Sequence, residues 1–434
     1  MAETIDGVLV DLVLAQLDES LSVQMNEILH HRDFQALERA WRSLHFLVQR
    51  TPRRQNIVIQ FVNVSKEDLA LDFEDAVEVL NSGLYRLVYV NQYGQFGGEP
   101  VGAILGNYEF YPQPRDIRLL TQIASVATMA HAPFIAAAGK AFFGIAAWEE
   151  LPNLSDLHYV YEMPQFAQWR SFREIEDARY VGLTLPRFLL RTPYTPESNC
   201  VESFRFVEDV ENSEAFCWGN AVFAFATRLV DSFSRFRSCV NIIGTEHGVV
   251  EGLTTCTYEA MGIIQEKIPT EVLISEKREL ELADAGFVAL AMLKGKKSAV
   301  FFSANSCQRP LSKRDGTSQR VVSFNLSHQL PNMFLISRLA HYIKVLQREY
   351  IGSWKGAKEL ERELNKWLAQ YITTMTDPDE ATRAKHPFSF GEVRVEEVGE
   401  VGWYSVMLQV SPHAKYMGMS FTISLAGKLE KEQH

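Results

Sequence analysis

Near its carboxyl end the sequence alternates apolar and polar residues in two separate stretches, 403–410 and 419–426. A period of two residues over this length predicts two half-buried β-strands with a turn-like stretch between them. The residues expected to share the apolar side of this segment are Val393, Val395, Tyr404, Val406, Leu408, Val410, Phe421, Ile423 and Leu425. A lone hairpin is marginally stable in water and leaves unpaired backbone groups at its edges. The chain must therefore cover this hairpin itself or share it with a neighbour, and we interpret it as a joint in an intersubunit β-sheet.

Helical patterns precede that segment in two places. Apolar residues recur every three or four positions near the start, as at Leu17 and Leu21, and again later, as at Leu335 and Leu339. Strand and helix signals alternate between them, so we predict a mixed α/β (α+β) fold. Its expected parts are an N-terminal helical segment, a central α/β body, a C-terminal helical pair, a linker and a two-stranded β segment that joins an intersubunit sheet, over residues 1–54, 55–330, 331–376, 377–392 and 393–434.

Apolar runs in the central part predict individual strands. We expect strands at Asn56–Val62, Leu84–Val90 and Glu271–Ser275, and a helix at Pro114–Met129. Some runs are apolar without alternation, which is typical of strands covered on both faces.

Charge and cysteine content exclude several classes of protein. The formal net charge of −11 argues against nucleic acid as a partner. The five cysteines include no Cys-x-x-Cys pair, so we expect neither a disulfide framework nor a zinc site, and infer a reducing, cytoplasmic location. The best membrane candidate, Phe134–Trp148, is short and is interrupted by Lys140, so membrane insertion is not expected.

The sequence lacks the common catalytic motifs, including the nucleophile elbow, the zinc-protease helix and the dinucleotide fingerprint. Gly295-Lys296-Lys297-Ser298 resembles the end of a phosphate loop, but it lacks the leading glycine and stands between two predicted strands. We therefore predict no catalytic residue, no metal ligand and no cofactor. Two alternatives remain open: a monomeric adaptor that adds its hairpin to a partner's sheet, and an α/β enzyme of unknown reaction.

A series of short segments runs in one order from about residue 15 to about residue 430. They are Phe34–Glu38 with Trp41-Arg42, Tyr93–Pro100, His131–Ile135, Trp169–Glu174, Arg179–Leu189, Pro269–Val272, and Arg338–Tyr342 leading into Tyr350–Ser353. No single segment is specific, but their order and coverage resemble the large subunit of the type VI secretion contractile sheath, the TssC/VipB family.

This resemblance implies a structural protein of the bacterial cytoplasm. Such subunits pair with a small sheath subunit (TssB/VipA), associate with neighbouring protomers through their C-terminal strands, and stack helically around an inner tube of Hcp rings. The sheath grows on a baseplate and contracts to propel tube and spike. Family members commonly carry several tens more residues at the N-terminus, including a short helix that the ClpV unfoldase recognises. Because this sequence begins close to the helix before Phe34, recognition by ClpV through this subunit is not expected.

Two groups of basic residues are candidates for facing the tube or a partner. One group lies on a predicted helix and comprises Arg338, Lys344 and Arg348. The other, within a basic run of an otherwise acidic chain, comprises Lys294, Lys296 and Lys297. Either group could dock an acidic protein surface, with charge setting orientation more than affinity. The simpler interpretation of the second group is a solvated loop.

Overall fold

The computed structural model describes residues 7–94, 97–154, 156–196, 204, 206–210, 213–260, 263–293, 296–310, 328–350, 356–375, 378–397, 404–413 and 423–429. For residues 257–260, 263–267, 347–350, 380–381, 384, 404 and 423–429 it describes the backbone alone.

A mixed six-stranded sheet forms the centre of the body, in the order β1-β2-β3-β9-β10-β6. These strands are β1 (Ile104–Phe110), β2 (Phe134–Ala138), β3 (Val181–Leu185), β9 (Phe287–Met292), β10 (Ala299–Phe301) and β6 (Val249–Val250). The first four are parallel, and β10 runs antiparallel to both of its neighbours. This arrangement confirms the expected mixed α/β fold.

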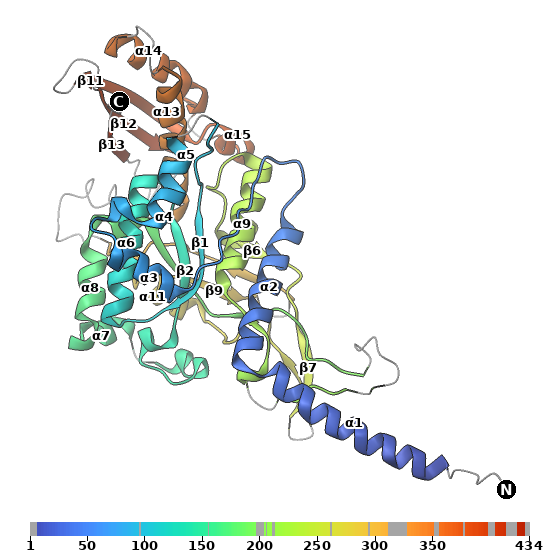
Figure 1. The fold of residues 1–434 in the computed structure, drawn as a ribbon. Coiled ribbons are helices and arrows are strands. Elements are labelled where there is room, and N and C mark those ends of the chain that lie inside the picture. Colours follow the sequence, from blue (N-terminus) through green and yellow to red (C-terminus); the bar gives the residue numbers. More distant parts are fainter. Residues whose placement is uncertain are drawn as a thin grey trace.

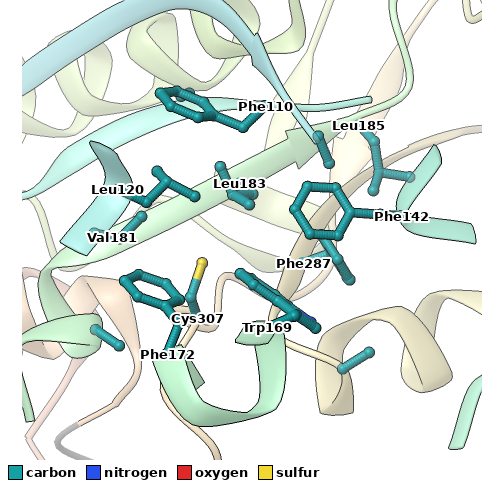
Figure 2. Packing of buried hydrophobic residues seen from close by; sticks show 14 of the residues in the cluster. Phe110, Leu120, Phe142, Trp169, Phe172, Val181, Leu183, Leu185, Phe287 and Cys307 are labelled. Atoms are coloured by element: carbon teal, nitrogen blue, oxygen red, sulfur yellow. The ribbon is translucent and has the colours of Figure 1, made fainter. Parts of the chain in front are cut away.

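Helices cover both faces of this sheet, which explains why its central strands are apolar without alternation. Phe134 packs on the side of α6 (Pro114–Ala130), whereas the next residue, Ile135, packs on the side of α9 (Ala221–Phe236). Figure 2 shows the first side, where Trp169 lies below β3 and its ring stacks with those of Phe172 and Phe287. The helix expected at Pro114–Met129 is confirmed as α6.

Smaller elements surround this core (Figure 1). The helices are α3 (Lys66–Asp75), α4 (Gly83–Tyr85), the π-helical η2 (Arg86–Val90), α5 (Asn91–Tyr93), α7 (Leu157–Glu162), α8 (Ala167–Glu174), α10 (Gly244–His247) and α11 (Glu276–Asp284). Two strand pairs lie outside the main sheet: β4 (Phe188–Leu189) with β5 (Trp218–Gly219), and β7 (Cys256–Ala260) with β8 (Ile263–Lys267). The short 3-10 helices are η1 (Val79–Asn81), η3 (Lys140–Phe143), η4 (Trp148–Asn153), η5 (Pro164–Phe166), η6 (Glu176–Tyr180), η7 (Ser213–Ala215) and η8 (Ala369–Tyr371).

The N-terminal helices are α1 (Gly7–Leu29) and α2 (Arg32–Arg50). A buried ionic network attaches α2 to the body, because Arg191 contacts Glu38 at 2.7 Å and Glu208 at 2.6 Å. Leu47 adds an apolar contact with α9. In contrast, α1 projects away from the body (Figure 1).

The C-terminal part consists of α13 (Leu330–Tyr350), α14 (Ala357–Leu368) and α15 (Glu380–Lys385), followed by β11 (Phe388–Glu397), β12 (Tyr404–Pro412) and β13 (Ile423–Leu429). The three strands form a separate antiparallel sheet in chain order. This sheet lies at the opposite end of the molecule from the tip of α1 (Figure 1). No helix in the described part is long and apolar enough to cross a bilayer.

Three strand predictions are wrong. Residues of Asn56–Val62 run irregularly between α2 and α3, with Val58 and Phe61 exposed, because no described strand pairs with them. The aromatic-rich Leu84–Val90 is helical: Ser82 caps its start, and the rings of Tyr85 and Tyr89 stack one turn apart. Glu271–Ser275 is irregular, and the Glu271 carboxylate accepts a hydrogen bond from Arg187.

The expected layout of the C-terminal end also needs correction. The range 377–392, expected as a linker, includes α15 and the first residues of β11. The expected two-stranded segment is a three-stranded sheet, since β11 pairs with β12 along its length. The alternation in β11 is broken at a bulge between Phe388, which is buried, and Phe390, which is exposed, so only Glu392–Glu396 alternates regularly.

Candidate assembly surfaces

The inner face of the C-terminal sheet is covered by helices of the same chain. Val393, Val395, Val406, Leu408 and Val410 are buried against α13 and α14 in one apolar cluster. These side chains, which the sequence placed in an intersubunit sheet, therefore belong to the core of their own chain. Phe421 and the side chains of Tyr404, Ile423 and Leu425 lie outside the described residues.

The β11 edge of this sheet is closed by α14. The Val393 N–H donates to Asn365 Oδ1 at 2.9 Å, and Asn365 Nδ2 donates to the Val393 carbonyl at 2.7 Å. The Val395 N–H donates to Glu361 Oε2 at 3.0 Å. Side chains thus take the place of a neighbouring strand, which is one way in which proteins protect a sheet edge. Another strand cannot add here without displacing α14.

The other edge is formed by β13, and no described element of the chain pairs with its far side. Because the backbone groups of Val393 point toward Asn365, those of its cross-strand partner Leu408 point toward β13. Leu408 pairs with Leu425, whose backbone groups point back to β12. Alternation then directs the N–H and C=O groups outward at Ser424, Ala426 and Lys428. No described residue of the chain pairs with these groups, so this side of β13 is open, as far as the described part goes, to a strand from another polypeptide.

Two basic residues on α13, Lys344 and His341, bind the C-terminal end of α6. Lys344 Nζ donates to the Met129 carbonyl at 3.0 Å, and His341 Nε2 donates to the Ala130 carbonyl at 3.1 Å. These carbonyls are acceptors that a helix end leaves unpaired, and the helix dipole favours positive charge there. Burial lowers the pKa of Lys344 to about 8 and that of His341 to about 4. The arrangement fixes α13, and with it the terminal sheet, to the body.

The basic residues proposed from the sequence therefore lie in different settings. Arg338 stacks on Phe233 and donates to the Tyr342 hydroxyl at 2.6 Å, so it is engaged within the chain as Lys344 is. Lys296 and Lys297 are exposed in the turn between β9 and β10. Lys294 and the side chain of Arg348 lie outside the described residues. The exposed turn is thus the better candidate for facing a tube or partner.

An apolar surface on the N-terminal helices was not recognised from the sequence. Most apolar side chains of α1 are exposed, and Leu29 is its one buried residue among those described. On α2, Trp41 is 61% exposed, and its ring contacts that of Phe61 with centroids 6.3 Å apart. The nearly continuous apolar stretch Val8–Leu14 was the available signal, since a helix that is apolar all round is normally buried.

The described residues do not gather into an arrangement suited to catalysis. No group of three or more His, Cys, Asp or Glu side chains among them could hold a metal ion. One cavity of about 490 Å³ near α7 is lined by both acids and arginines. Two of its three arginines are engaged with backbone carbonyls, since Arg170 donates to Met163 and Arg173 donates to Cys307 and Asp284. The third, Arg309, lies 3.9 Å from the Glu174 carboxylate. Such contacts hold loops in place and leave no evident acid–base pair.

Comparison with known proteins identifies the family. The EvpB/VC_A0108 tail sheath N-terminal domain (VipB) matches residues 11–308, and the corresponding gpW/gp25-like tail sheath domain matches residues 319–429. The chain belongs to the TssC/VipB sheath family. It is 39% identical over 430 residues to the type VI secretion system sheath protein TssC1 of Pseudomonas aeruginosa, and the aligned region covers 97% of this chain and 86% of that protein. As a member of this family the chain is a structural sheath subunit and not an enzyme.

The second family domain of this TssC/VipB protein contains both α13 and the whole terminal sheet. The helix that binds the end of α6 and the sheet with the open β13 edge are therefore parts of one sheath domain, joined to the first by the contacts of Lys344 and His341.

Proposed function

We propose that this sheath subunit pairs with the small sheath subunit (TssB/VipA), polymerises helically around the Hcp tube in the bacterial cytoplasm, and contracts to propel tube and spike. The observation that carries the proposal is the asymmetry of the terminal sheet. Its β11 edge is closed by Asn365 and Glu361, whereas its β13 edge directs backbone groups outward. One closed and one open edge allow addition in a single direction.

Addition in a single direction is the property that a polymer requires. A sheet with two open edges would recruit strands without limit, and one with none would recruit nothing. If the strand that binds β13 comes from a neighbouring protomer, the contact is heterologous, and repeating it generates an open-ended helical array. Buried side chains and α14 hold the acceptor sheet rigid. The strand that enters from the neighbour must then supply the freedom that lets the bodies rotate during contraction.

No nucleotide-binding loop is evident in the sequence, so the proposed energy source is the lattice itself. The extended sheath would be a trapped state of higher free energy, formed on the baseplate, and the contracted sheath the lower state. Continuous strand pairing would keep subunits connected while the remaining contacts change.

A monomeric adaptor that binds one partner by β-augmentation would use the same open edge. The size of the assembled product therefore distinguishes the sheath subunit from the adaptor. We would co-express the chain with the small sheath subunit and examine the product by negative-stain electron microscopy. The sheath proposal predicts hollow tubes. Discrete pairs without tubes would contradict it and favour the adaptor.

A further inference from the structure

The exposed helix α1 carries an apolar stripe with a seven-residue repeat. Its members are Val10, Leu14, Leu17, Leu21 and Ile28, which are between 41% and 53% exposed. Successive spacings of four, three, four and seven residues place these side chains along one line of the helix, as the core positions of a coiled coil are placed, with the polar Gln24 at the intervening core position. Helices gain most of their stability from packing such a stripe, yet α1 projects away from the body (Figure 1).

The charged residues beside this stripe are all acidic. Asp11 and Asp18 lie along one side of it and Glu27 along the other, and with Glu19 they are the charged residues of Gly7–Leu29, which contains no lysine, arginine or histidine. In a coiled coil the residues beside the core stripe face those of the partner helix and decide which helix pairs with which. Because Gly7–Leu29 carries no positive charge, two copies of α1 could form no opposite-charge pair between these helices, so the charges give self-pairing no support.

We propose that α1 forms a coiled coil with an amphipathic helix of a second, different polypeptide, whose apolar stripe is flanked by lysines and arginines. The charges then set the choice of partner, and the stripe supplies the affinity. The inference rests on the proposed function to the extent that the second polypeptide is taken to be the small sheath subunit. α1 would thus bind the small sheath subunit, at the opposite end of the molecule from the terminal sheet that joins one protomer to the next.

The test measures binding of the full chain to the small sheath subunit, separately from tube formation. We would pull down the chain with a tagged small subunit and measure the dissociation constant by dilution. Leu14→Asp combined with Leu21→Asp should weaken pairing at least about 100-fold, because charges would replace two leucines that the coiled coil buries. Leu12→Asp is the matched control: Leu12 is 65% exposed on the opposite side of α1, and this variant should bind within about 3-fold of the original chain.

A second pair of variants tests the charges. Asp11→Lys with Asp18→Lys should weaken pairing about 10-fold at low salt, and added salt should weaken the original pair while leaving this variant's pairing unchanged or stronger. Circular dichroism checks that each variant remains folded. We expect this because the substituted side chains are exposed in the unpaired chain. Pairing of the stripe variant within 3-fold of the original chain would overturn the inference, as would a homodimer of the original chain that Leu14→Asp dissolves. Absence of tubes from an intact pair would count against the proposed sheath function alone.

Discussion

Replacement of Ala426 by proline tests where the terminal sheet is completed. The N–H of Ala426 lies at the middle of the outward-facing positions of β13, between those of Ser424 and Lys428. A fully paired incoming strand would make about six backbone hydrogen bonds with these three residues, each with a net value of about 1 kcal/mol. Proline removes the central donor and places its ring where the incoming strand must lie. We expect a loss of about 3 kcal/mol or more per joint, which weakens association more than about 100-fold.

The assay is tube formation by the co-expressed pair, counted in electron micrographs, with thermal unfolding as a check on the body. Proline is tolerated in an edge strand where its nitrogen faces solvent, so Ala426→Pro should leave the body folded and abolish tubes. Ala426→Val retains the N–H and should form tubes. Leu425→Pro, one residue away, removes a donor that points to β12 and should destabilise the sheet itself. Normal tubes from Ala426→Pro would refute the assignment of β13 as the joining edge.

Three further substitutions test the contact of the terminal sheet with α14 and the contacts of α13 with the body. Asn365→Leu leaves the N–H and C=O of Val393 without partners and should lower the free energy of unfolding by about 2–4 kcal/mol; an unchanged urea midpoint would contradict this. Burial lowers the pKa of His341 to about 4, so the folded chain favours the neutral imidazole. The contribution of His341 to the free energy of unfolding is therefore complete above pH 6.5 and falls by about 3 kcal/mol as the pH drops toward 4. His341→Gln should therefore flatten the decline in stability between these pH values, and an equally steep decline would show that this imidazole is not responsible. Lys344→Glu places a carboxylate against the Met129 carbonyl, so it should lower the melting temperature of the chain; unchanged melting with lost tube docking would instead show that Lys344 faces the tube.

Local signals predicted much of the fold correctly. The apolar periodicity of Pro114–Met129 specifies α6 without reference to distant residues. Some runs of the sequence are apolar without alternation, and β9 is such a run because both of its faces are covered. Asn56–Val62 has the composition of a strand but has no pairing partner among the described residues of a single chain. Strand propensity cannot by itself supply a neighbouring strand.

The assembly surfaces were only partly predictable for a related reason. Alternation identified the residues of β12 and β13, but it could not show that Val406 and Leu408 pack on helices of their own chain. It also could not show that Asn365, about thirty residues before Val393 in the sequence, closes the β11 edge. Lys344 looked like a docking residue because a charge on a helix is usually solvated, whereas its partner is the distant Met129 carbonyl. Such pairings depend on contacts between distant parts of the chain, which spacing in the sequence does not record.

Hydrogen exchange of the β13 amides, measured before and after tube formation, tests the central claim most directly. Completion of the sheet by a neighbour predicts that the N–H groups of Ser424, Ala426 and Lys428 exchange at least about 100-fold more slowly in tubes than in the unassembled pair. The N–H groups of Val393 and Val395, already bound by Asn365 and Glu361, should be protected in both states. β13 amides that exchange at the same rate before and after assembly would contradict the account.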